Sequence, residues 1–313
     1  GNVKDGTNTG EVINVAMKKG WQVDEINERI TSELLENYDM LWMPDSLNAI
    51  TNEDLYIDLE AGVFKIENFI LQDEIDAIHE FVENGKNLMF VFNGVLGTDG
   101  AANVNATAVN KLLSKFDIKA VSEPLETPSN ALYIPTKNKT SLVKGVTKLT
   151  HFGNYLEIEG NAIPYTMDSK GRISGAIYTS DTGGDVLVAS SNFWMDNAGV
   201  RGEYSANVQG QMNDALLSNQ MWDWFSRENK IIKQSDNFID NKITGSFMLS
   251  SEGGTSSSEE PLVYLRPTLN IEKTFIEVSV NENGIYSFEY DVGERDGNYD
   301  VVVEYGGDYI SFN

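Results

Sequence analysis

The first 120 residues alternate between short apolar runs and amphipathic segments of helical spacing, and this alternation restricts the fold more than any other feature of the chain. In the segment 72–84, apolar residues recur every three or four positions, which predicts an amphipathic helix. The runs 39–44 and 87–92, which precede and follow it, are apolar almost throughout, as expected for strands that are covered on both faces. This strand–helix–strand order predicts a parallel sheet with right-handed crossovers.

Further segments extend this pattern. We predict helices at residues 9–19, 31–38, 105–116 and 211–229, and strands at residues 21–26 and 118–122. In the last of these helices we expect Leu216, Leu217, Met221, Trp224 and Phe225 to be buried. Beyond Pro124, four apolar stretches between residues 155 and 191 alternate with tight turns that contain glycine, which predicts four more strands.

The part of the chain after residue 229 shows no convincing helix. Its apolar residues alternate with polar ones, which predicts half-buried strands and a small β-sandwich. The segments with this alternation are 242–249, 261–269, 274–280, 284–292 and 299–305. We therefore place an α/β domain at residues 1–229 and an all-β sandwich domain at residues 230–313.

The charge of the chain is strongly one-sided, with 48 acidic against 23 basic residues and a net charge of −25. Such a surface repels phosphate groups, so neither nucleic acid nor an anionic membrane is expected as a partner. It suits an extracellular or cell-surface setting, where Ca²⁺ or salt screens the repulsion between like charges. No stretch reaches the ~20 apolar residues that a membrane-spanning helix needs.

The chain contains no cysteine. Disulfides, thiolate metal sites and a thiol nucleophile are therefore excluded. No G-x-G-x-x-G motif follows an early strand, so the sequence does not indicate a nucleotide-binding Rossmann domain.

Four stretches of the α/β domain together carry a resemblance to a known family: "LLENYDMLWMPD", "LQDEIDAIHEFVENGKNLMFVFN", "DVLVASSNFWMDN" and the helix ending in "WDWF". Residues 1–228 resemble the class I glutamine amidotransferase-like domain, in the non-catalytic form found in cell-surface proteins and beside subtilisin-like proteases. The resemblance implies a Rossmann- or flavodoxin-like, mostly parallel sheet. The segments "NGIYSFEYDV" and "GNYDVVVEYGG" are similar to Ig-like modules of extracellular proteases and surface-layer proteins.

The same resemblance implies a degenerate catalytic site. In the active enzymes, the turn after the strand that corresponds to 87–92 carries a cysteine nucleophile, whereas this chain has Asn93 and Gly94 there. We therefore expect a binding or assembly module rather than an enzyme, as the accessory region of a subtilisin-like protease or as part of a surface-layer protein. The Asn93–Gly94 turn is expected at the carboxyl edge of the sheet, where open α/β sheets hold ligands.

A serine hydrolase is the alternative hypothesis. Ser190 and Ser191 follow a buried strand and are the best candidates for an exposed nucleophile, although no G-x-S-x-G motif surrounds them. His79 and His151 are the only histidines that could act as a base. The acidic neighbours of His79 on its predicted helix favour a surface residue, and two histidines without cysteine are too few for a zinc site.

Calcium is the one cofactor that the sequence suggests, although the stretch that suggests it is more readily explained as a solvated hairpin turn that binds no ion. The stretch "DVGERDGNYD" gathers hard oxygen ligands around a glycine turn, although its spacing differs from that of an EF-hand. The candidate ligands are Asp291, Glu294, Asp296, Asn298 and Asp300. Two N-x-T sequons, at Asn105 and Asn138, are candidate glycosylation sites in an exported chain.

The start of the chain leads to a hypothesis about partners. Amidotransferase-like domains open with a buried strand ahead of the first helix, but the eight residues before the helix at 9–19 are polar and rich in glycine. Gly1 is neither a Met nor part of a signal sequence, which indicates a processed end. Two outcomes follow: the sheet is incomplete at its start, which we favour, or the chain has adapted to a smaller sheet. In the first case, a protein partner, an upstream segment of the same precursor or self-assembly would complete the sheet by strand addition.

Overall fold

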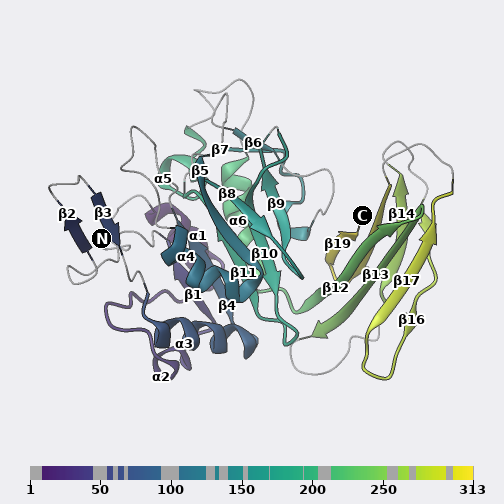
Figure 1. Ribbon diagram of the computed structural model, residues 1–313, viewed down its shortest axis with the longest axis horizontal. Coiled ribbons are helices and arrows are strands. Elements are labelled where there is room, and N and C mark those ends of the chain that lie inside the picture. Colours follow the sequence, from purple (N-terminus) through teal and green to yellow (C-terminus); the bar gives the residue numbers. More distant parts are fainter. Residues whose placement is uncertain are drawn as a thin grey trace.

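The structure is a computed structural model, and its elements form one mixed sheet with helices on both faces, a pair of antiparallel sheets and a small hairpin (Figure 1). It describes residues 9–44, 55–58, 63–66, 70–92, 106–124, 131–133, 140–150, 154–168, 170–192, 194–203, 213–251, 260–267, 273–293 and 299–312. The class is therefore mixed α and β, with most of the regular structure in strands.

The large sheet has nine strands in the order β1-β4-β11-β10-β9-β6-β7, with β8 beside β10 and β5 beside β8. Its strands are β1 (Met40–Met43), β4 (Asn87–Val91), β5 (Ile118–Pro124), β6 (Ala131–Tyr133), β7 (Lys148–Thr150), β8 (Asn154–Ile158), β9 (Ile163–Met167), β10 (Ile173–Thr179) and β11 (Asp185–Ala189). The neighbours β1, β4 and β11 pair in parallel, whereas every other pairing in this sheet is antiparallel.

The mostly parallel sheet expected from the sequence is thus present only in these three strands. The strand β5, which was expected to continue the parallel pattern, pairs antiparallel with β8 instead. A short apolar strand is compatible with either direction, and the direction is set by the connection that brings it to its neighbour.

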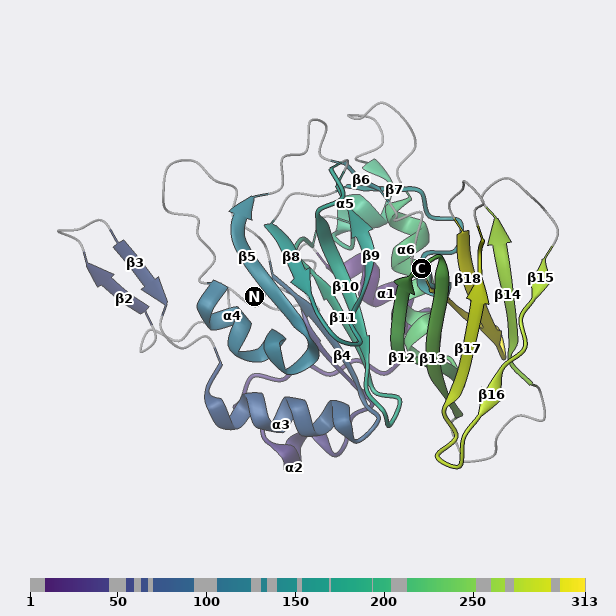
Figure 2. The ribbon, with the colours of Figure 1, turned by 45° about the vertical axis from the view of Figure 1, so that its right-hand side comes forward.

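Helices cover both faces of the large sheet (Figure 2). They are α1 (Gly10–Lys18), α2 (Ser32–Leu35), α3 (Gln72–Glu83), α4 (Ala106–Leu113), α5 (Asn197–Val200) and α6 (Asp214–Phe225), with short 3₁₀ turns at Ser114–Phe116 and Ser141–Val143. Buried apolar side chains of α1 and α6, such as Val12 and Leu217, belong to one apolar cluster, here called the first core. Others from α3 and α4, such as Ile75 and Leu112, belong to a second core on the opposite face.

The strand β4 lies inside the sheet, as its unbroken apolar run predicted. All five of its residues are buried, and Met89 and Phe90 are both 0% exposed. Successive residues point to opposite faces, so Met89 belongs to the first core and Phe90 to the second.

Two details of the sequence analysis are wrong. Leu216 on α6 is 36% exposed, whereas the neighbouring Leu217 is fully buried, because only one face of this helix meets the first core. Residues 21–26 form no strand. Two of their apolar side chains pack against the cores instead, Trp21 against the first core and Ile26 against the second.

The C-terminal part consists of two four-stranded antiparallel sheets. One has the order β12 (Asn229–Ile239), β13 (Lys242–Ser251), β17 (Tyr286–Asp291) and β16 (Ser279–Val280); the other has β15 (Thr274–Phe275), β14 (Leu262–Pro267), β18 (Tyr299–Tyr305) and β19 (Asp308–Phe312). The first and last strands, β12 and β19, were not predicted. A separate antiparallel hairpin is formed by β2 (Leu55–Asp58) and β3 (Val63–Ile66).

The two C-terminal sheets pack face to face through aromatic residues. The rings of Phe288 in β17 and Phe312 in β19 meet edge to face, with centroids 5.2 Å apart. Gly245 in β13 makes room for them, because a Cβ at this position would lie 2.5 Å from the Phe288 ring. The alternation read from the sequence therefore corresponds to a two-layer packing of strands.

Candidate functional site

The serine hydrolase alternative requires an exposed serine at the end of β11, which the structure does not have. Ser190 and Ser191 are both 0% exposed. The hydroxyl of Ser190 donates to backbone carbonyls, at 2.7 Å from the oxygen of Asn154 and 2.9 Å from that of Ser174. The hydroxyl thus links the end of β11 to the neighbouring strands β8 and β10. It could attack a substrate only after these hydrogen bonds had been broken.

The structure does not bring a histidine to these serines among the residues that it describes. His79 lies on α3, where its Nε2 is 3.8 Å from a carboxylate oxygen of Glu83 and its ring is 5.8 Å from that of Phe116. Its side chain is about one third exposed, in line with the expected surface position. His151 and the turn at Asn93 and Gly94 lie outside the described residues.

A buried carboxylate that the sequence analysis missed lies near this end of the sheet. Asp214, the first residue of α6, is 1% exposed and accepts hydrogen bonds from the amide and the hydroxyl of Thr150 in β7, at 2.8 and 2.7 Å. Burial raises the pKa of Asp214 to about 6, because the charged form is poorly solvated there, and nearby Asp196 acts in the same direction. In the sequence, Asp214 is indistinguishable from an ordinary acidic residue in the first turn of a helix.

A second group of buried charges joins the large sheet to the C-terminal sheets. Asp185 at the start of β11 lies 2.8 Å from Arg227 and 2.9 Å from Lys230, and its side chain is 0% exposed. Arg227 also reaches Asp308 of β19 at 3.1 Å. Asp308 in turn accepts hydrogen bonds from the hydroxyl of Ser141 and the amide of Ile231. We call Asp185, Arg227, Lys230 and Asp308 the joint cluster.

The charges of the joint cluster stabilise one another. Burial alone would raise the pKa of Asp185, but attraction by Arg227 and Lys230 outweighs it, and the pKa lies below its ordinary value. Burial alone would likewise lower the pKa of Arg227. Attraction by Asp185 and Asp308 outweighs burial, so the pKa lies above its ordinary value. Asp185 and Arg227 are therefore both ionised at neutral pH. The planar guanidinium of Arg227 also stacks over Trp224, 4.1 Å from the ring centroid.

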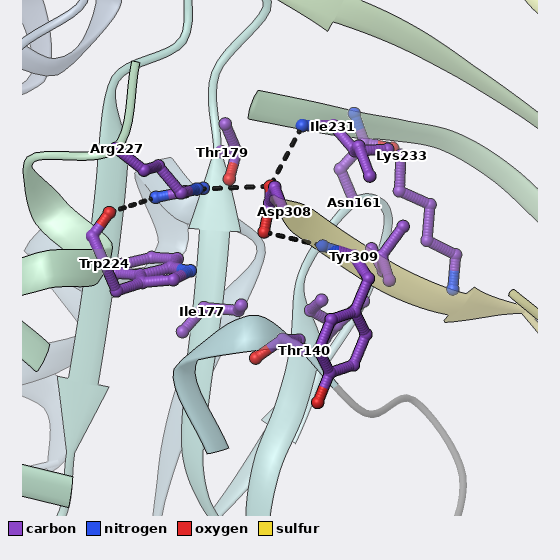
Figure 3. Close-up of a pocket in the computed structure, with 12 residues that line it drawn as sticks. Thr140, Asn161, Ile177, Thr179, Trp224, Arg227, Ile231, Lys233, Asp308 and Tyr309 are labelled. Carbon is purple, nitrogen blue, oxygen red and sulfur yellow. Dashed lines mark hydrogen bonds and ion pairs between the residues drawn. The ribbon is translucent and has the colours of Figure 1, made fainter. Parts of the chain in front are cut away.

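A cleft of about 360 Å³, counting its open mouth, lies beside the joint cluster (Figure 3). Its wall includes Arg227, Trp224, Thr140, Lys233 and Tyr309. The two cations in this wall already have counter-charges, Arg227 in the joint cluster and Lys233 with Asp236 at 2.6 Å. A charged ligand would have to separate existing ion pairs, so the cleft fits a structural joint better than a ligand site.

The described residues contain no group of three or more His, Asp or Glu side chains placed to hold a metal ion. Of the five candidate calcium ligands, Asp291 accepts a hydrogen bond from the amide of Gly293, and Asp300 pairs with Arg266 at 3.3 Å. Glu294, Asp296 and Asn298 lie outside the described residues, as do the sequon asparagines Asn105 and Asn138. The calcium site stays a prediction.

Comparison with models of known protein families gives no match, and neither does comparison with curated protein sequences. The likeness to amidotransferase-like and Ig-like domains therefore rests on the sequence patterns alone. No helix in the part of the chain that the structure describes has the length and apolar character needed to cross a membrane.

Proposed function

We propose that the chain is a non-catalytic binding or assembly module of an exported cell-surface protein. The observation that carries the proposal is the state of the hydroxyl groups after β11: Ser190 is fully buried and bonded to two backbone carbonyls, in a chain without a cysteine. The side chain of Ser190 holds neighbouring strands together instead of facing a substrate. On this view the chain works through its surfaces, as the accessory region of a subtilisin-like protease or as part of a surface-layer protein.

The fold within this proposal is a degenerate amidotransferase-like domain with a flavodoxin-like sheet, followed by an Ig-like sandwich. The parallel strands β1, β4 and β11, with helices on both faces, support the first part. The facing antiparallel sheets support the second. The strands β5 to β10, which pair antiparallel, depart from a flavodoxin-like sheet.

The extracellular setting is supported by the net charge of −25, which ions outside the cell would screen. Bound calcium at the 291–300 turn and glycans at Asn105 and Asn138 belong to the same proposal. Its partner is a protein, an upstream segment of the same precursor or another copy of the chain.

Labelling with a broad fluorophosphonate tests the non-catalytic assignment against a serine hydrolase. The intact chain should stay unlabelled under conditions in which subtilisin is labelled completely. Ser190→Ala and Ser191→Ala variants serve as controls. Covalent labelling that is lost in the Ser191→Ala variant, or in the Ser190→Ala variant, would show a reactive serine and overturn the proposal.

A further inference from the structure

The strand β1 is the last strand at one end of the large sheet among the described residues. On its inner side it pairs in parallel with β4, and the amide of Asn87 donates to the carbonyl of Asp39 at 3.0 Å. In a parallel pair, alternate residues direct their backbone groups toward the neighbour. The N–H and C=O groups of Met40 and Trp42 therefore point away from β4, where no described strand pairs with them.

This edge differs from an ordinary exposed edge because apolar layers enclose it on both faces. Met40 and Trp42 pack against the first core, below α1 and α6, and Leu41 is 7% exposed in the second core. A further strand beside β1 would lie between the same two layers. It would therefore be buried on both faces, which requires apolar residues at nearly every position.

Two buried indole groups beside this edge lack a hydrogen-bond acceptor. Nε1 of Trp42 and Nε1 of Trp222 are both inaccessible to solvent and unpartnered. Their rings meet edge to face at 5.9 Å, and Trp21 lies 5.6 Å from Trp222 on its other side. Buried tryptophan N–H groups normally find an acceptor. Their isolation here is a second sign that a polar group, such as a backbone carbonyl, is missing at this place.

We infer that β1 accepts a strand from a partner polypeptide: an extended segment of about four to six mostly apolar residues that adds to the unpaired edge. The length follows from the four residues of β1. The inference rests on the proposed function, and it specifies the surface and the chemistry of the partner.

A single strand fits this edge better than a second copy of the chain does. Pairing of β1 with β1 of another copy would also bring the helices that cover both faces of the second large sheet to this edge (Figure 2). An extended segment carries no such layers. Its backbone supplies donors and acceptors for Met40 and Trp42, while its side chains enter the two cores.

Selection from a library of random twelve-residue peptides displayed on phage tests this inference. The intact chain is the bait, and selected peptides are then synthesised for fluorescence-anisotropy titration. The decisive variant is Met40→Pro, which removes an outward N–H and leaves the ladder to β4 in place, as edge strands tolerate. Met40→Ala is its matched control, and Met40→Lys is a second blocking variant in case proline disturbs the fold.

We expect enriched peptides with an apolar run of four or more residues. Their affinity should fall at least tenfold in Met40→Pro and Met40→Lys and change less than threefold in Met40→Ala. Hydrogen exchange at Met40 and Trp42 should slow when the peptide binds. A library that yields no such peptide, or peptides that bind all variants equally, would overturn the inference.

Sedimentation of the peptide-free chain tests the second copy as occupant. A dimer that Met40→Pro dissociates would replace the partner strand by self-pairing and overturn the inference in its present form. Neither result depends on fluorophosphonate labelling, so failure of this inference can be told apart from failure of the non-catalytic assignment.

Discussion

Two buried aspartates differ in whether a cation faces them, and this decides how each affects stability. Asp185 meets Arg227 and Lys230 within 3 Å, so its charge is compensated in the fold. Among the described residues, Asp214 accepts hydrogen bonds from Thr150 alone, and another carboxylate, Asp196, lies nearby. Burial acts to raise the pKa of both carboxyl groups, but attraction by Arg227 and Lys230 lowers that of Asp185, whereas that of Asp214 stays raised.

Asp185→Asn should lower the free energy of unfolding by about 3–5 kcal/mol, because it leaves buried Arg227 and Lys230 short of counter-charge. Urea unfolding followed by tryptophan fluorescence measures this loss. Glu289→Gln is the control, since it breaks an exposed pair of similar length, 2.6 Å, with Lys242. Glu289→Gln should lower the free energy of unfolding much less than Asp185→Asn does. Equal effects of the two substitutions would contradict the role of the joint cluster.

Asp214 should make the protein less stable as the pH rises from about 4 to about 6. Its pKa in the folded state is about 6 against an ordinary value of 3.8, so the folded state binds the proton more tightly than the unfolded state. The stabilisation is complete below the unfolded pKa and is lost as the pH passes the folded pKa. The difference is on the order of 3 kcal/mol.

Urea unfolding of the wild type and of Asp214→Asn at a series of pH values from 4 to 8 checks this expectation. The variant cannot titrate at this position, so the wild type should lose stability relative to it across the window. Asp223→Asn, an exposed carboxylate on the same helix, serves as the control. Parallel curves for the wild type and Asp214→Asn would refute the prediction.

Single helices and strands show how well local periodicity predicts an element and how poorly it predicts the exact buried face. The predicted helix at 72–84 corresponds to α3, and the apolar residues that give it its helical spacing, Ile75, Ile78, Phe81 and Val82, are all buried. On α6, in contrast, adjacent leucines differ in exposure. The apolar residues of α6 surround more than half of the helix, so the sequence alone does not show which of them faces the sheet.

The pair Leu216 and Leu217 offers a matched test of this correction. Leu217→Ala should lower the free energy of unfolding by about 2–5 kcal/mol, because it opens a cavity in the first core. Leu216→Ala removes the same atoms from a partly exposed position and should cost about 1 kcal/mol or less. Thermal or urea unfolding of both variants gives the comparison. A larger loss for Leu216→Ala would mean that α6 is rotated about its axis.

The large sheet and the C-terminal sheets form a continuous structure. The first core contains side chains from α1 and α6 together with side chains from both C-terminal sheets. The joint cluster adds ion pairs across the same boundary, and Thr140 forms a β-bridge with Ile310 of β19. We therefore expect the two parts to move as one body, and a partner bound at β1 would be held rigidly relative to the C-terminal sheets.

The net charge of −25 should make stability depend on dissolved cations. Screening reduces the repulsion between carboxylates, which opposes the compact state. The melting temperature should rise from a low-salt buffer with EDTA to the same buffer with millimolar Ca²⁺. Sodium chloride at matched ionic strength separates screening from binding. No change in melting temperature with either salt would mean that the surface carboxylates are hydrated and do not destabilise the fold. It would also mean that the 291–300 turn binds no calcium.

Much of the element map could be predicted because it depends on neighbours along the chain. The spacing of apolar residues predicts the helix α3 and the buried strand β4. Together with glycines in the connecting turns, it also predicts the strands β8 to β11. The cap of α2 is equally local, since the hydroxyl of Thr31 accepts from the amide of Leu34. The joint cluster could not be foreseen, because Arg227 lies 42 residues from Asp185 and 81 from Asp308.

The amino-acid order thus specifies where helices and strands form, that the surface is acidic and that no thiol chemistry is possible, since each depends on residue type and local spacing. Strand direction, the unpaired edge of β1, the burial of Ser190 and the pairing of Asp185 arise only when distant segments meet. Their physical basis is the same in each case. A polar group taken out of water must find a partner among whatever the fold places beside it, and local sequence does not contain that partner.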